Sequence, residues 1–289
     1  MIERNLCVCS VLIINIESGE IMSQFVYKVH GNDLQYVQFT LAGGQEALAE
    51  QGAMMFIDQH IAMDAILGDG SASRFGGIGR FFNAVKRSFT GESMFSSLYT
   101  NNSDFPQNIA IAAPGPGEIV PINLDEQGGS VICQKGAYLA GQRGQRVQIA
   151  FQKRVRVGLF GGEGFIMQKI SGQGTVFIHA SGTLKQVALG PTDTLKIDTG
   201  CLVGMSSSVR YDIKYTGKLK TSLFGGEGLF YATVSGPGTV WMQSLPMNRL
   251  SKALMAAAVT GRSRGSVLGK LYLVGIVVFV AISIFAGKQ

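Results

Sequence analysis

The sequence contains the stretch Phe160-Gly161-Gly162-Glu163-Gly164, which returns 64 residues later as Phe224-Gly225-Gly226-Glu227-Gly228. A shorter counterpart stands upstream at Phe89-Thr90-Gly91-Glu92. An apolar strand pattern follows each Gly-Glu turn, and each unit also has a strand start that begins with glycine. These starts are Gly52-Ala53-Met54-Met55, Gly136-Ala137-Tyr138-Leu139 and Gly200-Cys201-Leu202-Val203. A repeat of this length makes each unit a small subdomain, so we expect a triplicated body.

Short runs in which apolar and polar residues alternate predict half-buried antiparallel strands, as at 147–151 and 194–198. Matching hairpin signals stand at Gly172-Gln173-Gly174 and Gly236-Pro237-Gly238. Inside the body we expect one helix, at 79–88, where apolar and basic residues take opposite faces. The sequence therefore predicts an all-β fold of three pseudo-repeated jelly-roll or β-sandwich units.

Charge is distributed unevenly along the 289 residues, which carry a formal net charge of +6. Residues 1–246 hold 19 basic and 19 acidic residues, whereas residues 247–289 hold six basic residues and no acidic one. The body is therefore neutral, which argues against a nucleic-acid-binding role for the chain as a whole. Among the four cysteines, Cys7-x-Cys9 lacks a second pair and is a weak metal or disulfide signal, so nothing demands an oxidising compartment.

The last part of the chain predicts a membrane anchor. Residues 267–286 form an apolar stretch about as long as a bilayer core is thick, interrupted by one lysine. We expect a transmembrane tail anchor there, with a buried C-terminal helix as the alternative. Basic residues precede it, which places the body on the cytoplasmic side. These membrane-proximal residues are Arg249, Lys252, Arg262, Arg264 and Lys270.

The predicted organisation has four parts. Residues 1–21 are an N-terminal extension outside the fold, and residues 22–246 form the body, divided at about 22–114, 115–181 and 182–246. Residues 247–266 form a basic stem, either an amphipathic helix on the membrane or a linker. Residues 267–286 form the anchor.

The repeated glutamates are the first candidate site. Glu92, Glu163 and Glu227 either accept hydrogen bonds from the amides of their turns or meet as a cation site. We favour the structural role for them and for the glycines of the repeat. The repeat motif is then Gly91, Glu92, Gly162, Glu163, Gly226, Glu227, Gly52, Gly136 and Gly200.

Two further sets of residues allow other functions. A metal-dependent jelly-roll enzyme would use Asp58, His60 and Asp64, although the three histidines of the chain form no His-x-His pair. Basic residues recur in the two later units and would contact RNA or lipid phosphates, or else keep a sheet edge from pairing. They are Arg146, Arg154, Arg156, Arg210, Lys218 and Lys220. No nucleophile elbow or phosphate loop occurs, so we expect no enzyme, no cofactor and no metal.

The Gly-Glu motifs, the phrase at 136–140 and Ala113-Pro114-Gly115-Pro116-Gly117 resemble the altered-inheritance-of-mitochondria family of bacterial and mitochondrial proteins. The resemblance covers about residues 22–245. It implies a fold similar to the tryptophan RNA-binding attenuation protein, with trimers in some members. The mitochondrial relatives look like inner-membrane proteins that support membrane organisation.

From the residues and the resemblance together we expect a non-catalytic, membrane-anchored scaffold or interaction protein that supports membrane organisation or integrity. Its expected partners are membrane lipids, further copies of itself, with a trimer suspected, and unidentified proteins that dock at exposed sheet edges. The alternatives are a module that binds RNA or another anionic ligand, and the metal-dependent enzyme.

Overall fold

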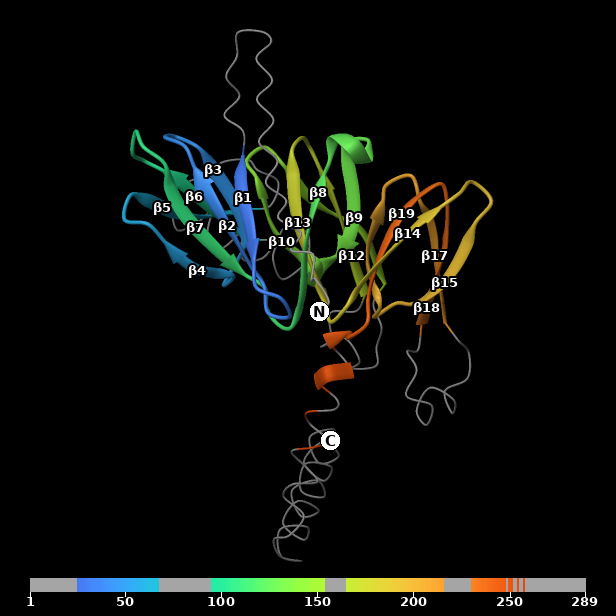
Figure 1. The fold of residues 1–289 in the computed structure, drawn as a ribbon. Helices are drawn as coiled ribbons and strands as arrows, with labels where there is room; N and C mark the ends of the chain where they lie inside the picture. The colour runs from blue at the N-terminus through green and yellow to red at the C-terminus, as the bar shows by residue number, and fades with distance from the viewer. Residues whose placement is uncertain are drawn as a thin grey trace, which may run out of the picture.

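The computed structural model describes residues 25–67, 95–153, 165–215 and 230–247, together with 249–251, 254 and 257 (Figure 1). Its strands fall into three sequential units. Unit 1 holds β1 (Val26–His30), β2 (Tyr36–Leu41), β3 (Glu46–Glu50), β4 (Met54–Ile57), β5 (Ile61–Leu67), β6 (Phe95–Asn101) and β7 (Gln107–Ala112). Unit 2 holds β8 (Gly117–Asn123), β9 (Ser130–Gln134), β10 (Tyr138–Gln142), β11 (Arg146–Lys153), β12 (Phe165–Ser171) and β13 (Thr175–Ser181). Unit 3 holds β14 (Leu184–Leu189), β15 (Thr194–Asp198), β16 (Leu202–Ser206), β17 (Arg210–Tyr215), β18 (Phe230–Ser235) and β19 (Gly238–Gln243).

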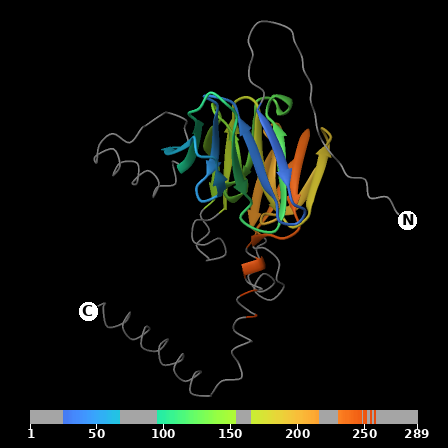
Figure 2. The same ribbon diagram turned by 60° about the vertical axis from the view of Figure 1, so that its left-hand side comes forward.

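The strands form four antiparallel sheets. Their orders are β1-β2-β7-β4, β5-β6-β3-β10-β13-β8, β11-β12-β9-β16-β19-β14 and β15-β18-β17. Two short 3₁₀ helices, η1 (Asp125–Gln127) and η2 (Lys135–Ala137), lie between the strands of unit 2. Figures 1 and 2 both show β4 and β5 on one flank of the molecule and the strands of unit 3 on the other.

Each unit repeats one six-stranded pattern. The first, sixth and third strands lie side by side in one sheet, as β2-β7-β4, β8-β13-β10 and β14-β19-β16. The second, fifth and fourth strands lie side by side in another sheet, as β3-β6-β5, β9-β12-β11 and β15-β18-β17. β1 is an extra strand added to unit 1. The repeated topology explains the repeated sequence, because the same strand order needs the same turns.

Neighbouring units share sheets, since the second strand of one unit pairs with the third strand of the next. β3 pairs with β10, and β9 pairs with β16. The hydrophobic cores are shared in the same way. Phe177 of unit 2 packs into the core of unit 1, and Trp241 of unit 3 packs into the core of unit 2. The units are therefore not separate domains.

The expectation of an all-β body agrees with the structure, but the expectation of a C-terminal transmembrane helix is wrong. Among the residues that the structure describes, no helix is long and apolar enough to cross a membrane. The apolar residues 267–286, on which we based that helix, lie outside the described ranges, as do the predicted helix at 79–88 and the extension at 1–21. The description as jelly rolls like the tryptophan RNA-binding attenuation protein stays a prediction.

Candidate functional site

The three repeated strand-start glycines occupy equivalent connections. Gly52 lies between β3 and β4, Gly136 between β9 and β10, and Gly200 between β15 and β16. Gly52 has a φ of +82°, in the left-handed region that side chains rarely adopt. These glycines turn the chain from the second strand of a unit to its third, which crosses from one sheet to the other.

Most of the other predicted site residues lie outside the described part of the chain, so their roles stay predictions. They are Gly91, Glu92, Gly162, Glu163, Gly226, Glu227, Arg154, Arg156, Lys218, Lys220, Lys252, Arg262, Arg264 and Lys270.

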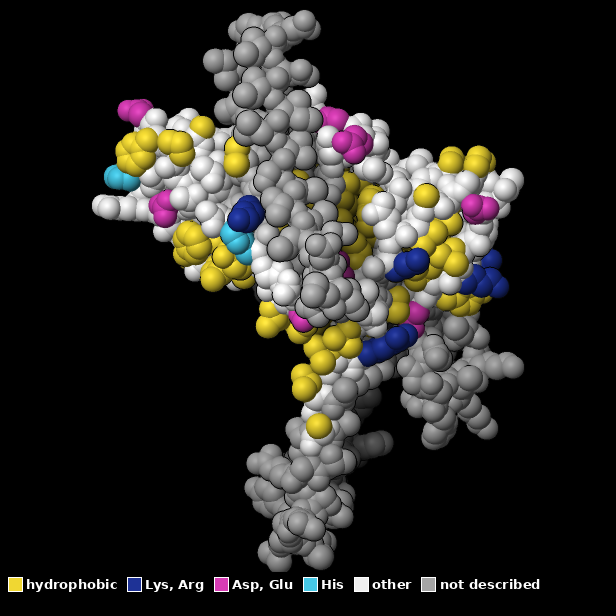
Figure 3. Space-filling view, viewed as in Figure 1, with side chains coloured by type: hydrophobic (Ala, Val, Ile, Leu, Met, Phe, Trp, Pro, Cys, Tyr) yellow, Lys and Arg dark blue, Asp and Glu magenta, His cyan; other side chains and the backbone are white. Residues whose placement is uncertain are grey.

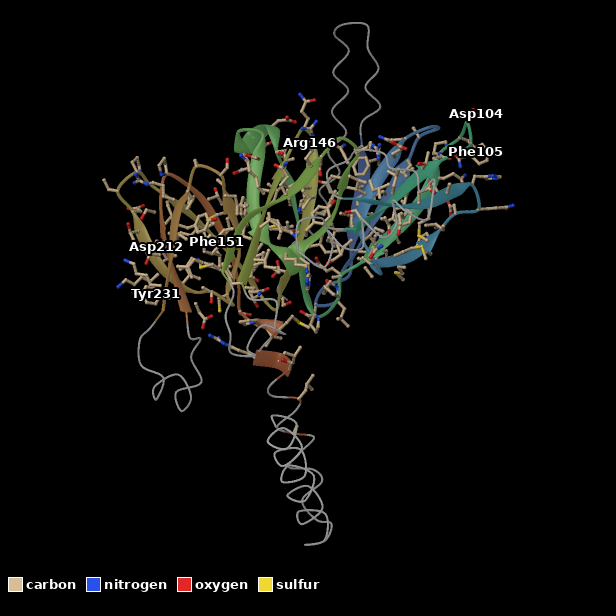
Figure 4. The ribbon with its side chains drawn as sticks, turned by 180° about the vertical axis from the view of Figure 1, so that it is seen from behind. Asp104, Phe105, Arg146, Phe151, Asp212 and Tyr231 are labelled. Carbon is tan, nitrogen blue, oxygen red and sulfur yellow. The ribbon has the colours of Figure 1, made fainter. Side chains whose placement is uncertain are left out.

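Three of the predicted basic residues are described. Arg146 is exposed at the first position of β11, opposite Ser171 (Figure 4). Arg210 is exposed at the first position of β17, opposite Ser235, and belongs to a different sheet. Arg249 Nη2 lies 3.1 Å from Asp198 Oδ2 at the end of β15. Arg249, which we expected near a membrane, therefore ties the segment after the body back to unit 3.

The residues suggested for a metal site make other contacts. Asp58 Oδ2 accepts hydrogen bonds from the backbone N–H of Asn108 at 2.7 Å and from its side-chain Nδ2 at 3.1 Å. The His60 ring meets the edge of Phe105, with centroids 5.4 Å apart. Within the described ranges, no group of three His, Cys, Asp or Glu side chains could hold a metal ion. The described residues therefore give no support to a metal held by Asp58, His60 and Asp64.

Titratable groups with shifted pKa values gather where units 1 and 2 meet. Burial raises the pKa of the Glu50 carboxyl to about 7, and the Lys135 ammonium opposes this shift only in part. Burial also raises the pKa of the Cys133 thiol to about 12, with a smaller contribution from Glu50. Burial moves the pKa of the Tyr138 hydroxyl upward as well. A thiol that stays protonated is a poor nucleophile, so this cluster is not suited to covalent catalysis.

The feature that stands out chemically is β4, one of the two edge strands of the first sheet. Its side chains Met54, Met55 and Phe56 are 41%, 55% and 38% exposed, and all three are large and apolar. Figure 3 shows yellow hydrophobic side chains gathered on the flank where Figure 1 places β4. Proteins usually protect such edges with charges or proline. β4 has neither.

The strands equivalent to β4 are buried. Tyr138 and Leu139 of β10 are 3% and 0% exposed; β3 of the preceding unit pairs along that edge, and Leu139 packs in the core of unit 1. Leu202 and Val203 of β16 are fully buried in the same way, beside β9. β4 therefore has the composition of a covered strand, while the described residues place no strand along its second side.

An open edge of this kind can bind one type of partner. It presents unpaired backbone N–H and C=O groups to an added strand, and its apolar side chains offer contacts that favour a second protein surface. We did not single out β4 from the sequence, because Met54-Met55 follows the same pattern as its covered counterparts. A usable signal was present in the repeat itself. Three units make two internal junctions, so the third strand of unit 1 has no preceding unit to pair with.

The fold and the edge define a class of protein: an all-β chain of three tandem sandwiches that share sheets, with an apolar strand open at one end. The chain belongs to the family described as mitochondrial biogenesis AIM24, whose model matches residues 27–245. The family expected from the Gly-Glu motifs is thereby confirmed.

Two bacterial proteins resemble this chain over most of its length. An uncharacterised protein of Streptococcus pyogenes serotype M6 is 30% identical over 222 residues, which is 75% of this chain and 84% of that protein. The crystal structure of a Streptococcus pyogenes protein matches with a TM-score of 0.65 and 25% identity, covering 81% of this chain and 99% of the other. The similarity extends across all three units.

Proposed function

We propose that this chain is a non-catalytic scaffold that binds other proteins by adding a strand to β4. One observation carries the proposal: Met54 and Met55 are exposed, whereas their equivalents in units 2 and 3 are buried in strands that pair with the preceding unit. The proposal does not include the transmembrane helix that we expected, and it does not depend on the predicted location at a membrane.

Energetics support binding at this edge. Covering the exposed apolar surface of a large side chain contributes about 25 cal/mol for each Å² removed from water. Three such side chains on one short strand, together with the hydrogen bonds of an added strand, give a compact interaction site. The shifted groups at Glu50, Cys133 and Tyr138 offer no comparable basis for a reaction.

The test is site-specific photo-crosslinking in cells, with a photoreactive amino acid at Met55 and the same amino acid at Met63 in a matched protein. Met63 is an equally good reporter of exposure, because both methionines are 55% exposed and both lie in unit 1. We expect protein adducts at position 55 well above those at position 63. Equal capture at the two positions, or no capture at position 55, would contradict the proposal.

A charge substitution provides the second arm. Met55→Lys places an ammonium on the binding edge, and we expect it to abolish the adducts formed through a reporter at Met54. Met63→Lys should leave them unchanged. Both side chains already face solvent, so both variants should keep the far-UV circular dichroism and the melting temperature of the parent protein.

A further inference from the structure

The two junctions between units are built to one register. Where β3 meets β10, Ala49 lies opposite Ala140 and Leu48 opposite Gly141. Where β9 meets β16, Cys133 lies opposite Gly204 and Ile132 opposite Met205. Both pairings are antiparallel, and both join the second strand of one unit to the third strand of the next. The chain thus uses one geometry twice.

Each end of the molecule carries one half of this junction. β4 is the third strand of unit 1, and its pairing with β7 shifts register between Met54 and Phe56. The same shift occurs in β10 between Tyr138 and Ala140, and in β16 between Leu202 and Gly204. Phe56 therefore occupies the place of Ala140 and Gly204. At the other end, β15 is the second strand of unit 3 and the edge of its sheet.

Equivalent positions in β15 follow from its neighbour β18. Ile197 lies opposite Ala232 of β18, as Cys133 lies opposite Gln168 of β12. Ile197 thus corresponds to Cys133, and Lys196 corresponds to Ile132. Figure 1 shows β4 and β15 on opposite flanks, so the two halves cannot meet within one molecule.

The cores show the same incompleteness. The core of unit 1 includes Leu139 and Phe177 from unit 2, and the core of unit 2 includes Val203 and Trp241 from unit 3. Among the described residues, no unit follows unit 3 to supply such residues to its core. Met55 holds the position of Leu139 and Val203 in its own strand, yet it is 55% exposed where they are fully buried.

We propose that β15 of one copy pairs antiparallel with β4 of a second copy, with Ile197 opposite Phe56 and Lys196 opposite Ile57. This inference rests on the proposed function, because it names the strand that β4 binds. The contact joins two different surfaces, so copies associate head to tail, and the assembly is a closed ring or an open filament. Met55 of the added copy then covers the core of unit 3.

The proposed junction differs from the internal ones on both strands, since Phe56 replaces Ala140 and Gly204 in β4 and Lys196 replaces Leu48 and Ile132 in β15. Lys196 is exposed and stands where the internal junctions have Leu48 and Ile132, which are 4% and 9% exposed. A lysine on an edge strand opposes uncontrolled pairing while the edge faces water. Burying part of its stem is tolerated, since the ammonium can reach solvent. The junction between copies is therefore weaker than the internal junctions, and association is reversible.

Disulfide crosslinking between two differently marked chains tests the register. Both chains carry Cys7→Ser, Cys9→Ser and Cys201→Ser. Cys133 stays, because it is buried and 1% exposed. One chain adds Ile57→Cys and the other adds Lys196→Cys. On mild oxidation we expect a crosslinked pair in the mixture and none from either chain alone. A mixture of Phe56→Cys with Lys196→Cys is the mismatched control, because a slip of one residue turns the thiols to opposite faces.

Each outcome decides the question. Crosslinks confined to the matched mixture support the pairing, whether electron microscopy shows rings or filaments. Crosslinks within the Ile57→Cys chain alone would mean that β4 pairs with β4, which overturns this inference and leaves the proposed function intact. Monomers at every concentration, with no crosslink, also overturn it, and unchanged photo-crosslinking after Met55→Lys would overturn the proposed function itself.

A variant expected to strengthen association provides a test whose positive result cannot come from misfolding. Lys196→Ile restores the residue type of the internal junctions. We expect it to tighten association about tenfold, the factor that one well-covered aliphatic side chain contributes to an equilibrium. Sedimentation equilibrium of the full chain measures the change. An unchanged or weaker association in this variant would contradict the proposed register.

Discussion

Replacing Phe177 by alanine tests whether the units share their cores. Phe177 belongs to β13 of unit 2, is fully buried, and packs into the core of unit 1. The centroid of its ring lies 4.8 Å from that of the Tyr27 ring and 5.0 Å from that of the Phe39 ring, with interplanar angles of 80° and 62°. Removing a buried phenylalanine costs about 3–5 kcal/mol of unfolding free energy. Two edge-to-face contacts place Phe177→Ala toward the upper end of that range.

Chemical and thermal unfolding followed by far-UV circular dichroism measures this loss. A destabilisation of about 3–5 kcal/mol lowers the melting temperature by about 6–20 °C in a domain of this size. Trp241 is the only tryptophan of the chain and is 3% exposed between units 2 and 3, so its fluorescence reports the next junction. We expect its transition to move together with the circular dichroism signal.

Phe105→Ala is the matched control, since Phe105 is 53% exposed at the far flank of unit 1 (Figure 4). It should change the unfolding free energy by less than about 0.5 kcal/mol. A loss below about 1 kcal/mol in Phe177→Ala would refute the shared core, because a side chain so buried must leave a cavity. Separate transitions for Trp241 and circular dichroism would refute the coupling between units.

Three other predictions concern single residues. Glu50→Gln should raise stability at pH 8 by about 1–3 kcal/mol and leave it unchanged at pH 4, because the raised pKa of Glu50 makes the folded state lose stability as pH rises from 4.5 to about 7. Asn101→Ala should cost about 2–4 kcal/mol in urea unfolding, since its buried amide donates to the Leu41 and Phe105 carbonyls, whereas the exposed Asn102→Ala should be neutral. Gly117→Ala should destabilise the fold and lower its melting temperature, because the φ of Gly117 is +149° and a Cβ there would meet the Ala180 carbonyl oxygen. A Cβ at Gly115 has room, so Gly115→Ala should keep the melting temperature of the parent protein.

Local patterns made part of this fold predictable from the sequence. Strands such as β11 and β15 follow alternation over a few residues, and the hairpin between β12 and β13 follows its glycines at Gly172 and Gly174. These features depend on near neighbours in the chain, and the family followed from the same short motifs.

Such local patterns do not predict which strands of different units pair. Whether Met55 is covered depends on strands from elsewhere, since Leu139 in the same sequence context lies in β10 beside β3 and is buried in the core of unit 1. The pKa of Glu50 likewise depends on burial where two units meet. The transmembrane helix was expected from the hydropathy of residues 267–286, which lie outside the described ranges, and no helix of the described residues could cross a membrane.

Because units 2 and 3 supply residues to the core of the preceding unit, the order of synthesis affects when each core can form. A chain leaves the ribosome from its N-terminus, and the last strand of unit 1, β7, ends at residue 112, well before Phe177. At roughly 5–20 residues per second, on the order of several seconds pass before β13 emerges. Throughout that interval the core around Phe39 and Ile109 in the nascent first unit lacks the residues that unit 2 supplies, such as Phe177. Exposed apolar surface of this kind makes a nascent chain prone to aggregation, and the same interval recurs when unit 2 emerges ahead of Trp241.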